Sequence, residues 1–248
     1  MDRSMAEYPI INADDFGMSA SVNEAILIAF KSGWINSASL MANLAGFDDA
    51  CGLLESEAVK GRVGVHLNLS EGRPLTQRMA ECERFCDAAG VFRFRSPSLR
   101  HAAMHLNAHE RTAVQEELDA QIQACIARGL RPTHLDSHLH QHNEWTIGTI
   151  VIGLARKNGI PAIRIMRNCK RLNPPKRIYT AIYNARLRGS HLARSCYFGA
   201  ANEMHTILES CREVEIMVHP KLKGGVVVDD KDVPLEHVIR SLPSLTQS

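Results

Sequence analysis

The chain has 248 residues, of which 45% are hydrophobic, 29 are Lys or Arg and 27 are Asp or Glu. This length is enough to bury a sizeable core as one large α/β domain, since single barrels commonly reach this size. The net charge of +2 supplies no overall basic field, so we expect no nucleic-acid partner.

Short β-branched or aliphatic runs alternate along the chain with longer segments of helical period. This alternation is typical of the βα units that build a parallel sheet or barrel. In chain order, the expected strands are 9–12, 37–41, 63–67, 133–137, 162–165 and 213–218. The helices expected between them are 21–32, 47–54, 110–128, 145–158 and 175–188.

A single domain over residues 1–248 fits this pattern better than two domains. The sequence contains no internal repeat and no low-complexity tract that would serve as a linker. Residues 70–108 show turn signals and hydrophobic pieces without a clean period, so we expect an elaborated loop over one end of the sheet. Such a loop could form one wall of a substrate groove.

The N-terminal segment and the apolar runs lead us to expect a soluble, cytoplasmic protein. Residues 1–8 lack an apolar stretch of signal-peptide length, and no later run is long and apolar enough to span a bilayer. The seven cysteines have irregular spacings and do not form a disulfide framework. Cys82 and Cys86 could lie one helical turn apart, but without a second pair nearby we expect ordinary thiols rather than a zinc site.

Two adjacent carboxylates stand at the end of the first expected strand. Asp14 and Asp15 follow an apolar run and come directly before Phe16 and Gly17. In parallel α/β folds, functional sites are built at the carboxyl ends of the strands. A lone Asp there would more often cap a helix or turn. Two neighbouring carboxylates repel each other unless a cation or a shared proton relieves them, so the pair predicts a functional site.

Single histidines mark two further strand ends. His66 lies at the end of the strand expected at 63–67, and His219 follows the one expected at 213–218. Taken alone, each is more often a hydrogen-bonded core residue than a ligand. Because several strand ends each present an ionisable group, the set as a whole favours a site.

A cluster of four histidines and one aspartate lies in residues 132–142. Strand alternation would place His134, Asp136 and His138 on one face of this segment. A barrel interior or sheet crevice lined in this way needs a charge to satisfy it, and a divalent metal supplies one. The cluster therefore predicts a metal site.

Four blocks of the sequence resemble the signature blocks of the YdjC-like carbohydrate deacetylases, a family that includes chitooligosaccharide deacetylases and hopanoid-associated members. The blocks are 12–17 (NADDFG), 64–69 (GVHLNL) with 72–75 (GRPL), 132–140 (PTHLDSHLH) and 215–220 (EIMVHP). They occur in the family's order within residues 8–222. The resemblance implies an irregular, TIM-like (β/α) barrel of the polysaccharide-deacetylase type. The final segment, 223–248, departs from many relatives.

The resemblance also implies roles for individual residues. It makes Asp15, His66 and His138 the ligands of one divalent metal ion, Asp14 the general base and His219 the general acid. The mixed nitrogen and oxygen ligands suit zinc and equally nickel, cobalt or manganese. Because the family also permits magnesium, magnesium and zinc are the favoured ions.

Other positions match motif residues beside this site. Asp136, His140 and Asn68 would orient the metal ligands or contact substrate. Arg164 resembles a family arginine that either holds Asp14 ionised or contacts substrate. The expected partner of the chain is an amino-sugar substrate, and a homodimer is one open alternative for its assembly.

The leading hypothesis is metal-dependent hydrolysis of an N-acetyl group from an amino sugar in a GlcNAc-containing oligosaccharide or glycoconjugate. One alternative is another barrel metallohydrolase such as a phosphoesterase, which usually requires a second metal and more basic residues. Another is a sugar-binding protein without turnover. Binding alone would not require both an acid and a base, which argues against this last alternative.

Overall fold

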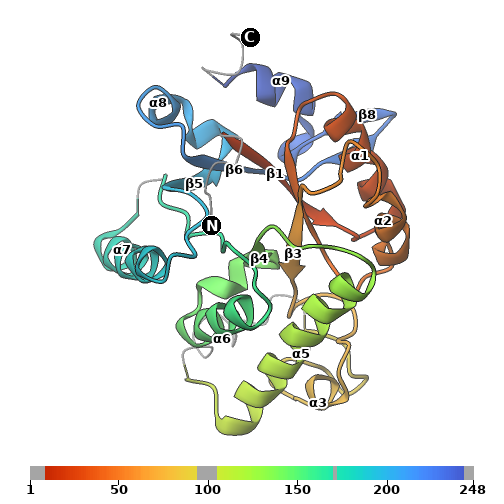
Figure 1. The fold of residues 1–248 in the computed structure, drawn as a ribbon, viewed down its shortest axis with the longest axis vertical. Helices are drawn as coiled ribbons and strands as arrows, with labels where there is room; N and C mark the ends of the chain where they lie inside the picture. The colour runs from red at the N-terminus through yellow and green to blue at the C-terminus, as the bar shows by residue number, and fades with distance from the viewer. Residues whose placement is uncertain (1–8, 94–104, 170–171, 243–248) are drawn as a thin grey trace.

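The structure, a computed structural model, describes residues 9–93, 105–169 and 172–242. The polar segment 1–8 and part of the expected loop, residues 94–104, lie outside the described residues. Six parallel strands form one curled sheet in the order β4-β3-β2-β1-β6-β5 (Figure 1). They are β1 (Ile10–Phe16), β2 (Ser37–Leu40), β3 (Val63–Leu67), β4 (Leu135–Ser137), β5 (Tyr197–Ala200) and β6 (Val214–Val218). A separate antiparallel pair follows, β7 (Lys221–Lys223) and β8 (Val226–Val228).

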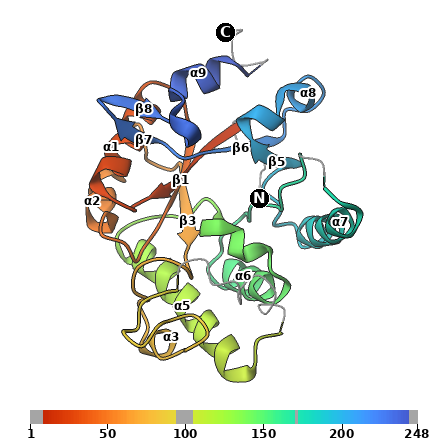
Figure 2. The ribbon, with the colours of Figure 1, turned by 180° about the vertical axis from the view of Figure 1, so that it is seen from behind.

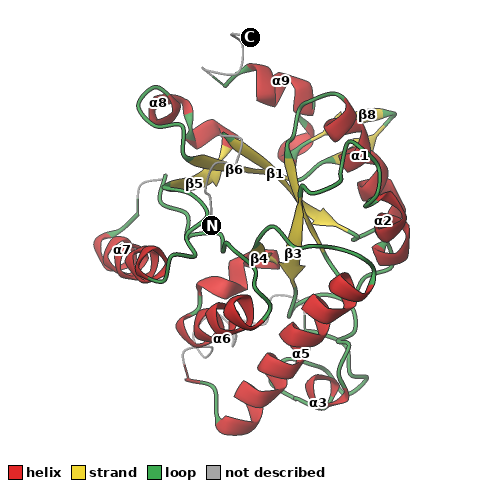
Figure 3. Ribbon diagram, in the orientation of Figure 1, coloured by secondary structure: helices red, strands yellow, loops and turns green. Residues whose placement is uncertain are grey.

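Helices surround the curled sheet on its outside, as Figures 1 and 3 show. The α-helices are α1 (Ala20–Lys31), α2 (Phe47–Leu53), α3 (Gln77–Ala80), α5 (Ala108–Ala127), α6 (Trp145–Lys157), α7 (Pro174–Gly189), α8 (His205–Leu208) and α9 (Leu235–Arg240). Short 3-10 helices are η3 (His138–Asn143), η4 (Ala201–Glu203) and η5 (Asp230–Asp232). No helix in the described part of the chain is both long and apolar enough to cross a membrane.

Side-chain caps fix where several helices begin. The Ser19 hydroxyl accepts a hydrogen bond from the Val22 amide at the start of α1. Asn107 and Glu110 form a reciprocal capping box at the start of α5. Each cap satisfies an amide that has no partner inside its helix, so the helix begins at a defined residue.

The strand expected at 162–165 is reduced to one bridging residue. Ile163 forms a parallel bridge to Leu135 of β4 and another to Ala193, just before β5. Beyond it, the Asn184 side chain binds both the amide and the carbonyl of Met166, at 2.8 and 3.0 Å. Those backbone groups therefore have no strand partner. The bridges at Ile163 link the two edges of the sheet and confirm the predicted irregular, TIM-like barrel.

The sequence interpretation missed β5 as a strand. The segment has no β-branched residue, and it contains Gly199. A Cβ at Gly199 would lie 2.6 Å from the Glu203 carboxylate, so a larger residue there would have to displace that side chain. Residues 197–200 nevertheless pair in parallel with β6, so this short strand is defined by tertiary pairing.

Every residue of β3 and of β6 is buried, as expected for parallel strands covered on both faces. Two of these buried residues are polar, His66 in β3 and Glu215 in β6. A buried charge or polar ring is costly unless it is paired. The partners of these two side chains define the candidate site.

Candidate active site and metal centre

Asp14 and Asp15 lie in a bulge near the end of β1. The register between β1 and β2 shifts between Ala13 and Phe16. Asp15 has a positive φ of 66°, which aspartate tolerates better than most residues. Consecutive residues of a regular strand point to opposite faces. The bulge removes that alternation, so both carboxylates can serve one site.

Gly17 makes the tight turn after this bulge possible. Its φ is 87°, and a Cβ at this position would lie 2.7 Å from the Met41 carbonyl oxygen. The Gly17 amide donates to the Asn23 side chain at 2.7 Å, which anchors the turn to α1. The glycine of the first sequence block thus holds the carboxylates in place.

The three residues proposed as metal ligands converge. Asp15 Oδ1 lies 2.9 Å from His138 Nδ1 and 3.3 Å from His66 Nε2. One ligand atom from each of the three residues lies within 4.8 Å of the others. Two imidazoles and one carboxylate at this spacing match the donor set of a divalent metal. These side chains therefore fit one divalent cation.

Each histidine of this group has a carboxylate at its other ring nitrogen. His66 Nδ1 lies 2.8 Å from Asp136 Oδ1, and His138 Nε2 lies 3.1 Å from Glu71 Oε1. Ser39 donates to the other oxygen of Asp136 at 2.9 Å. Carboxylates in this position set the tautomer and orientation of a ligating histidine. Asp136 therefore lies against His66, one of the three proposed ligands.

Sequence reasoning missed Glu71. The signal available was an acidic residue directly before the GRPL block. Asn68 brings it to His138: the Asn68 side chain accepts from the Glu71 amide at 3.1 Å and donates to its carbonyl at 2.8 Å. The structure thus gives Asn68 a role in shaping the turn that carries Glu71.

Arg164 is buried at the centre of three carboxylates. Its guanidinium binds both oxygens of Asp14 at 2.8 and 2.7 Å. It also lies 2.8 Å from Asp136 Oδ2 and 2.8 Å from Glu215 Oε1. The Phe198 ring lies 4.7 Å from the guanidinium carbon. Arg164 thus pairs with Asp14, one of the two roles considered for it.

Both consecutive aspartates are held ionised. Burial opposes ionisation of Asp14, but Arg164 outweighs burial and holds its pKa below the usual range. Burial likewise opposes ionisation of Asp15, and hydrogen bonds from His138 and His66 lower its pKa well below the usual range. The site therefore presents two carboxylate anions side by side.

His219 lies on the other side of Asp14. Its Nε2 is 3.9 Å from Asp14 Oδ2 and its Nδ1 is 3.3 Å from Asp230 Oδ2. Its backbone amide donates to Asp229 at 2.6 Å. Burial lowers the pKa of His219, but Asp230, Asp14 and Asp15 raise it to about 9. The sequence interpretation treated 223–248 as a divergent segment and missed both of its aspartates that contact His219.

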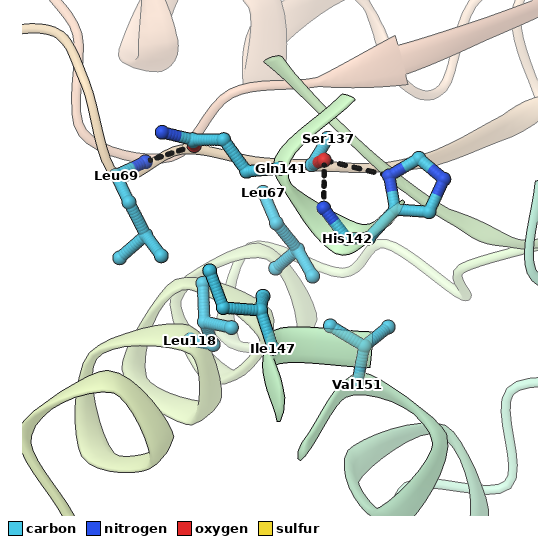
Figure 4. A pocket seen from close by; sticks show the side chains of 8 residues that line it. All are labelled: Leu67, Leu69, Leu118, Ser137, Gln141, His142, Ile147 and Val151. Carbon is cyan, nitrogen blue, oxygen red and sulfur yellow. Dashed lines mark hydrogen bonds between the residues drawn. The ribbon is translucent and has the colours of Figure 1, made fainter. Parts of the chain in front are cut away.

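The loop that carries His138 has an unusual backbone. Leu139 and His140 have positive φ angles of 52° and 56°. Figure 4 shows how neighbouring side chains hold this loop beside a small apolar pocket. Ser137 Oγ bonds the ring and the amide of His142, and Gln141 accepts from the Leu69 amide at 2.9 Å. These bonds position His138 at the end of β4.

His140 does not contact the three proposed ligands. Its buried ring packs edge-on against Phe198, with 5.5 Å between the ring centroids. Burial, together with Arg164, lowers its pKa to about 3, so this ring is neutral. The contact with Phe198 gives His140 a packing role beside the site.

Residues 9–237 match the sequence model of the family described as YdjC-like protein. The chain belongs to this family. A carbohydrate deacetylase from Halalkalibacterium halodurans is 34% identical over 213 residues, which cover 85% of the YdjC-like chain and 84% of that relative. A carbohydrate deacetylase from Geobacillus stearothermophilus is 33% identical over 217 residues, covering 87% and 80% of the two chains.

A solved structure shares the fold of the YdjC-like chain. It is that of an Enterococcus faecalis V583 protein provisionally described as a cellobiose-phosphate cleavage protein. The match has a TM-score of 0.67 and 24% sequence identity, and it covers 95% of this chain and 84% of the other. At this identity, the likeness concerns the fold alone.

Proposed function

We propose that the chain is a carbohydrate deacetylase that hydrolyses the N-acetyl group of an amino sugar in a metal-dependent reaction. The substrate would be a GlcNAc-containing oligosaccharide or glycoconjugate. The observation that carries this proposal is the placement of Asp14, which lies next to Asp15 of the candidate metal group and 3.9 Å from His219. The curated relatives named carbohydrate deacetylases support the substrate class.

A divalent ion held by Asp15, His66 and His138 would polarise the acyl oxygen and make water a stronger nucleophile. Asp14 is ionised and would take a proton from the attacking water. In the metal-free chain the pKa of His219 is raised to about 9, so its ring carries the proton that it would give to the departing nitrogen. The products are acetate and the free amine of the sugar.

The charge distribution favours a neutral amide over a phosphoester. A phosphoesterase needs cationic groups that face its anionic substrate. Arg164, the cation beside Asp14, is buried and already binds Asp14, Asp136 and Glu215. Its donors are therefore directed at carboxylates of the chain rather than at a substrate anion.

Acetate release tests the proposal. The purified chain would be incubated with chitobiose, longer chitooligosaccharides, GlcNAc-bearing lipids and a phosphorylated sugar, with zinc, magnesium, nickel, cobalt or manganese supplied in turn. We expect acetate from at least one substrate, and loss of activity after chelation. Release that persists without metal would contradict the metal dependence, whereas release of phosphate from a phosphorylated sugar with no acetate from any substrate would favour the phosphoesterase.

A base variant separates catalysis from binding. Asp14→Asn keeps the size of the side chain but cannot take a proton, so we expect turnover to fall by roughly two to four orders of magnitude. Metal affinity should change far less. Asp119→Asn, which removes a surface partner of Lys157, is the control and should retain activity. Near-normal acetate release by Asp14→Asn would show that Asp14 is not the base.

A further inference from the structure

The charges of this nearly neutral chain are segregated. Residues 145–202 contain eleven Lys or Arg and no Asp or Glu. The acidic excess therefore lies in the remaining sequence. Four of them, Lys157, Arg164, Arg167 and Arg194, pair with carboxylates elsewhere in the chain, so a partner of opposite charge would meet the others. Helix α7 lies within this basic stretch and carries Lys176, Arg177, Arg186 and Arg188 with no acidic residue.

The outward face of α7 is apolar along its centre. Ile178 is 60% exposed and Ile182 is 53% exposed, and they are four residues apart. Ala181 and Ala185 are also exposed. These four residues follow the spacing of one helical face, so they form a continuous apolar stripe. We call Ile178, Ala181, Ile182 and Ala185 the α7 stripe.

Basic side chains flank the α7 stripe. Arg177 and Arg188 are exposed and fall on one side of it by helical geometry. Arg186 falls on the other side, where its guanidinium covers the Trp145 ring at 4.6 Å. Tyr179 lies between the stripe and the body of the protein, and its hydroxyl donates to the Asn143 carbonyl at 2.8 Å; burial and the nearby charge of Glu144 raise its pKa. The outer face thus combines apolar and cationic groups.

The opposite face of α7 is fixed to the body of the protein. Tyr183, Asn184 and Leu187 are buried. Asn184 binds the Met166 backbone, and the Tyr183 hydroxyl donates to the His142 carbonyl. Both views place α7 at the outer edge of the molecule (Figures 1 and 2). The α7 stripe therefore faces away from the core on a helix that is firmly attached.

We propose that α7 docks on the surface of an anionic phospholipid bilayer. A helix with a central apolar stripe and flanking arginines can sink its apolar side chains to the level of the headgroups. Its cations then meet the negative lipid surface, where each basic residue adds to binding. Docking two copies through the same face would bring Arg177 and Arg188 close to their counterparts. Because like charges repel, this disfavours a dimer through α7.

Vesicle co-sedimentation of the full chain, without substrate, tests the docking. We expect binding to phosphatidylcholine vesicles that contain phosphatidylglycerol, but not to phosphatidylcholine alone. Raising NaCl from about 0.1 M to about 0.5 M should weaken the binding. Failure to bind the anionic vesicles would overturn the proposal. Its outcome is separate from that of the acetate assay, since no turnover is measured.

Variants of α7 separate the apolar and ionic contributions. Ile178→Ser should reduce binding about tenfold, through loss of buried apolar area. Arg177→Gln should reduce it about fivefold. Val226→Ser is the matched control, because Val226 is also about half exposed but lies on β8. Binding that is insensitive to Ile178→Ser would overturn docking through the stripe. So would a dimer in solution that Ile178→Ser dissociates.

Discussion

The carboxylate of Glu71 lies 3.1 Å from Nε2 of His138, whereas Nδ1 of the same ring lies 2.9 Å from Asp15. The two ring nitrogens thus have different surroundings, and Glu71 would hold the Nδ1 side of the ring toward the proposed metal position. His66 has the same arrangement with Asp136 at its Nδ1. The candidate centre therefore contains two carboxylate-histidine pairs, contributed by β3, β4 and their loops.

Glu71→Gln is expected to weaken metal binding about tenfold, because a neutral amide orients the His138 ring less firmly and makes it a poorer ligand. Calorimetric titration of the metal-free chain with zinc or manganese measures the effect. Glu81→Gln serves as the control, since Glu81 is an exposed glutamate whose carboxylate accepts from the Gln77 side chain, away from the site. If Glu71→Gln abolished binding as completely as His138→Ala, Glu71 would be a metal ligand itself.

Asp230→Asn is expected to lower the pKa of His219. In the metal-free chain that pKa is raised to about 9, since burial is outweighed by Asp230, Asp14 and Asp15. The Asp230 carboxylate stabilises the protonated ring, so its loss favours the neutral ring. NMR titration of His219 measures the shift. Asp232→Asn, whose carboxylate binds Lys223 instead, should leave it unchanged.

The same variant bears on the role of His219 in turnover. A general acid must be protonated, so activity is lost as the pH rises through its pKa. In Asp230→Asn, the alkaline fall of kcat/KM should therefore begin at a lower pH than in the wild-type chain. An unchanged alkaline limb, together with a lowered His219 pKa, would exclude His219 as the acid.

Much of the site was predictable because its residues lie in contiguous blocks at strand ends. Asp14, Asp15, His66 and His138 were identified in this way, and parallel strands bring their carboxyl ends together. Glu71 and Asp230 were not, because each reaches the site through a turn. In a strand, the alternation of side chains indicates which face of the sheet each residue occupies, whereas a turn sequence gives no such indication. Their contacts depend on Asn68 and on the hairpin of β7 and β8, which only the fold reveals.

The fold, like the candidate site, could be predicted only in part. Strands with continuous aliphatic runs, such as β3 and β6, were predicted within two residues. The segment around Ile163 has the side chains of a strand. Its backbone, however, forms single bridges to Leu135 and Ala193, and the Met166 amide beyond them binds the Asn184 side chain. Strand pairing is a tertiary property, so a propensity for extended structure does not by itself make a strand.

Arg164→Met is expected to destabilise the chain by about 3–5 kcal/mol, because it leaves buried carboxylates without their shared cation. Urea unfolding at neutral pH measures this loss. Arg167→Met is the control: Arg167 also pairs with a carboxylate, that of Glu203 at 2.7 Å, but it is partly exposed. Its loss should cost no more than about 1 kcal/mol. Equal losses of unfolding free energy in the two variants would show that the buried contacts of Arg164 contribute no more to stability than the partly exposed pair of Arg167 and Glu203.

His142 should make stability fall at acidic pH. Its Nε2 lies 3.2 Å from the Arg164 carbonyl, which can only accept, so Nε2 carries the hydrogen. Nδ1 then accepts from the Ser137 hydroxyl, which in turn accepts from the His142 amide. The neutral ring is therefore fully bonded. Burial, only partly offset by Asp136, lowers its pKa from 6.5 to about 4.

The sign of this dependence follows from proton binding. Between pH 6.5 and about pH 4 the unfolded chain binds a proton at His142 that the folded chain does not, so the free energy of unfolding decreases as the pH falls. From pH 7.5 to pH 5, the free energy of unfolding of the wild-type chain should fall by roughly 2 kcal/mol more than that of His142→Gln, which has no titrating ring at this position. Urea unfolding of both chains at pH 7.5 and at pH 5 measures the difference. His140, whose pKa burial lowers to about 3, is present in both chains, so its contribution cancels in the comparison. Parallel pH profiles for the two chains would mean that His142 is not held neutral by the fold.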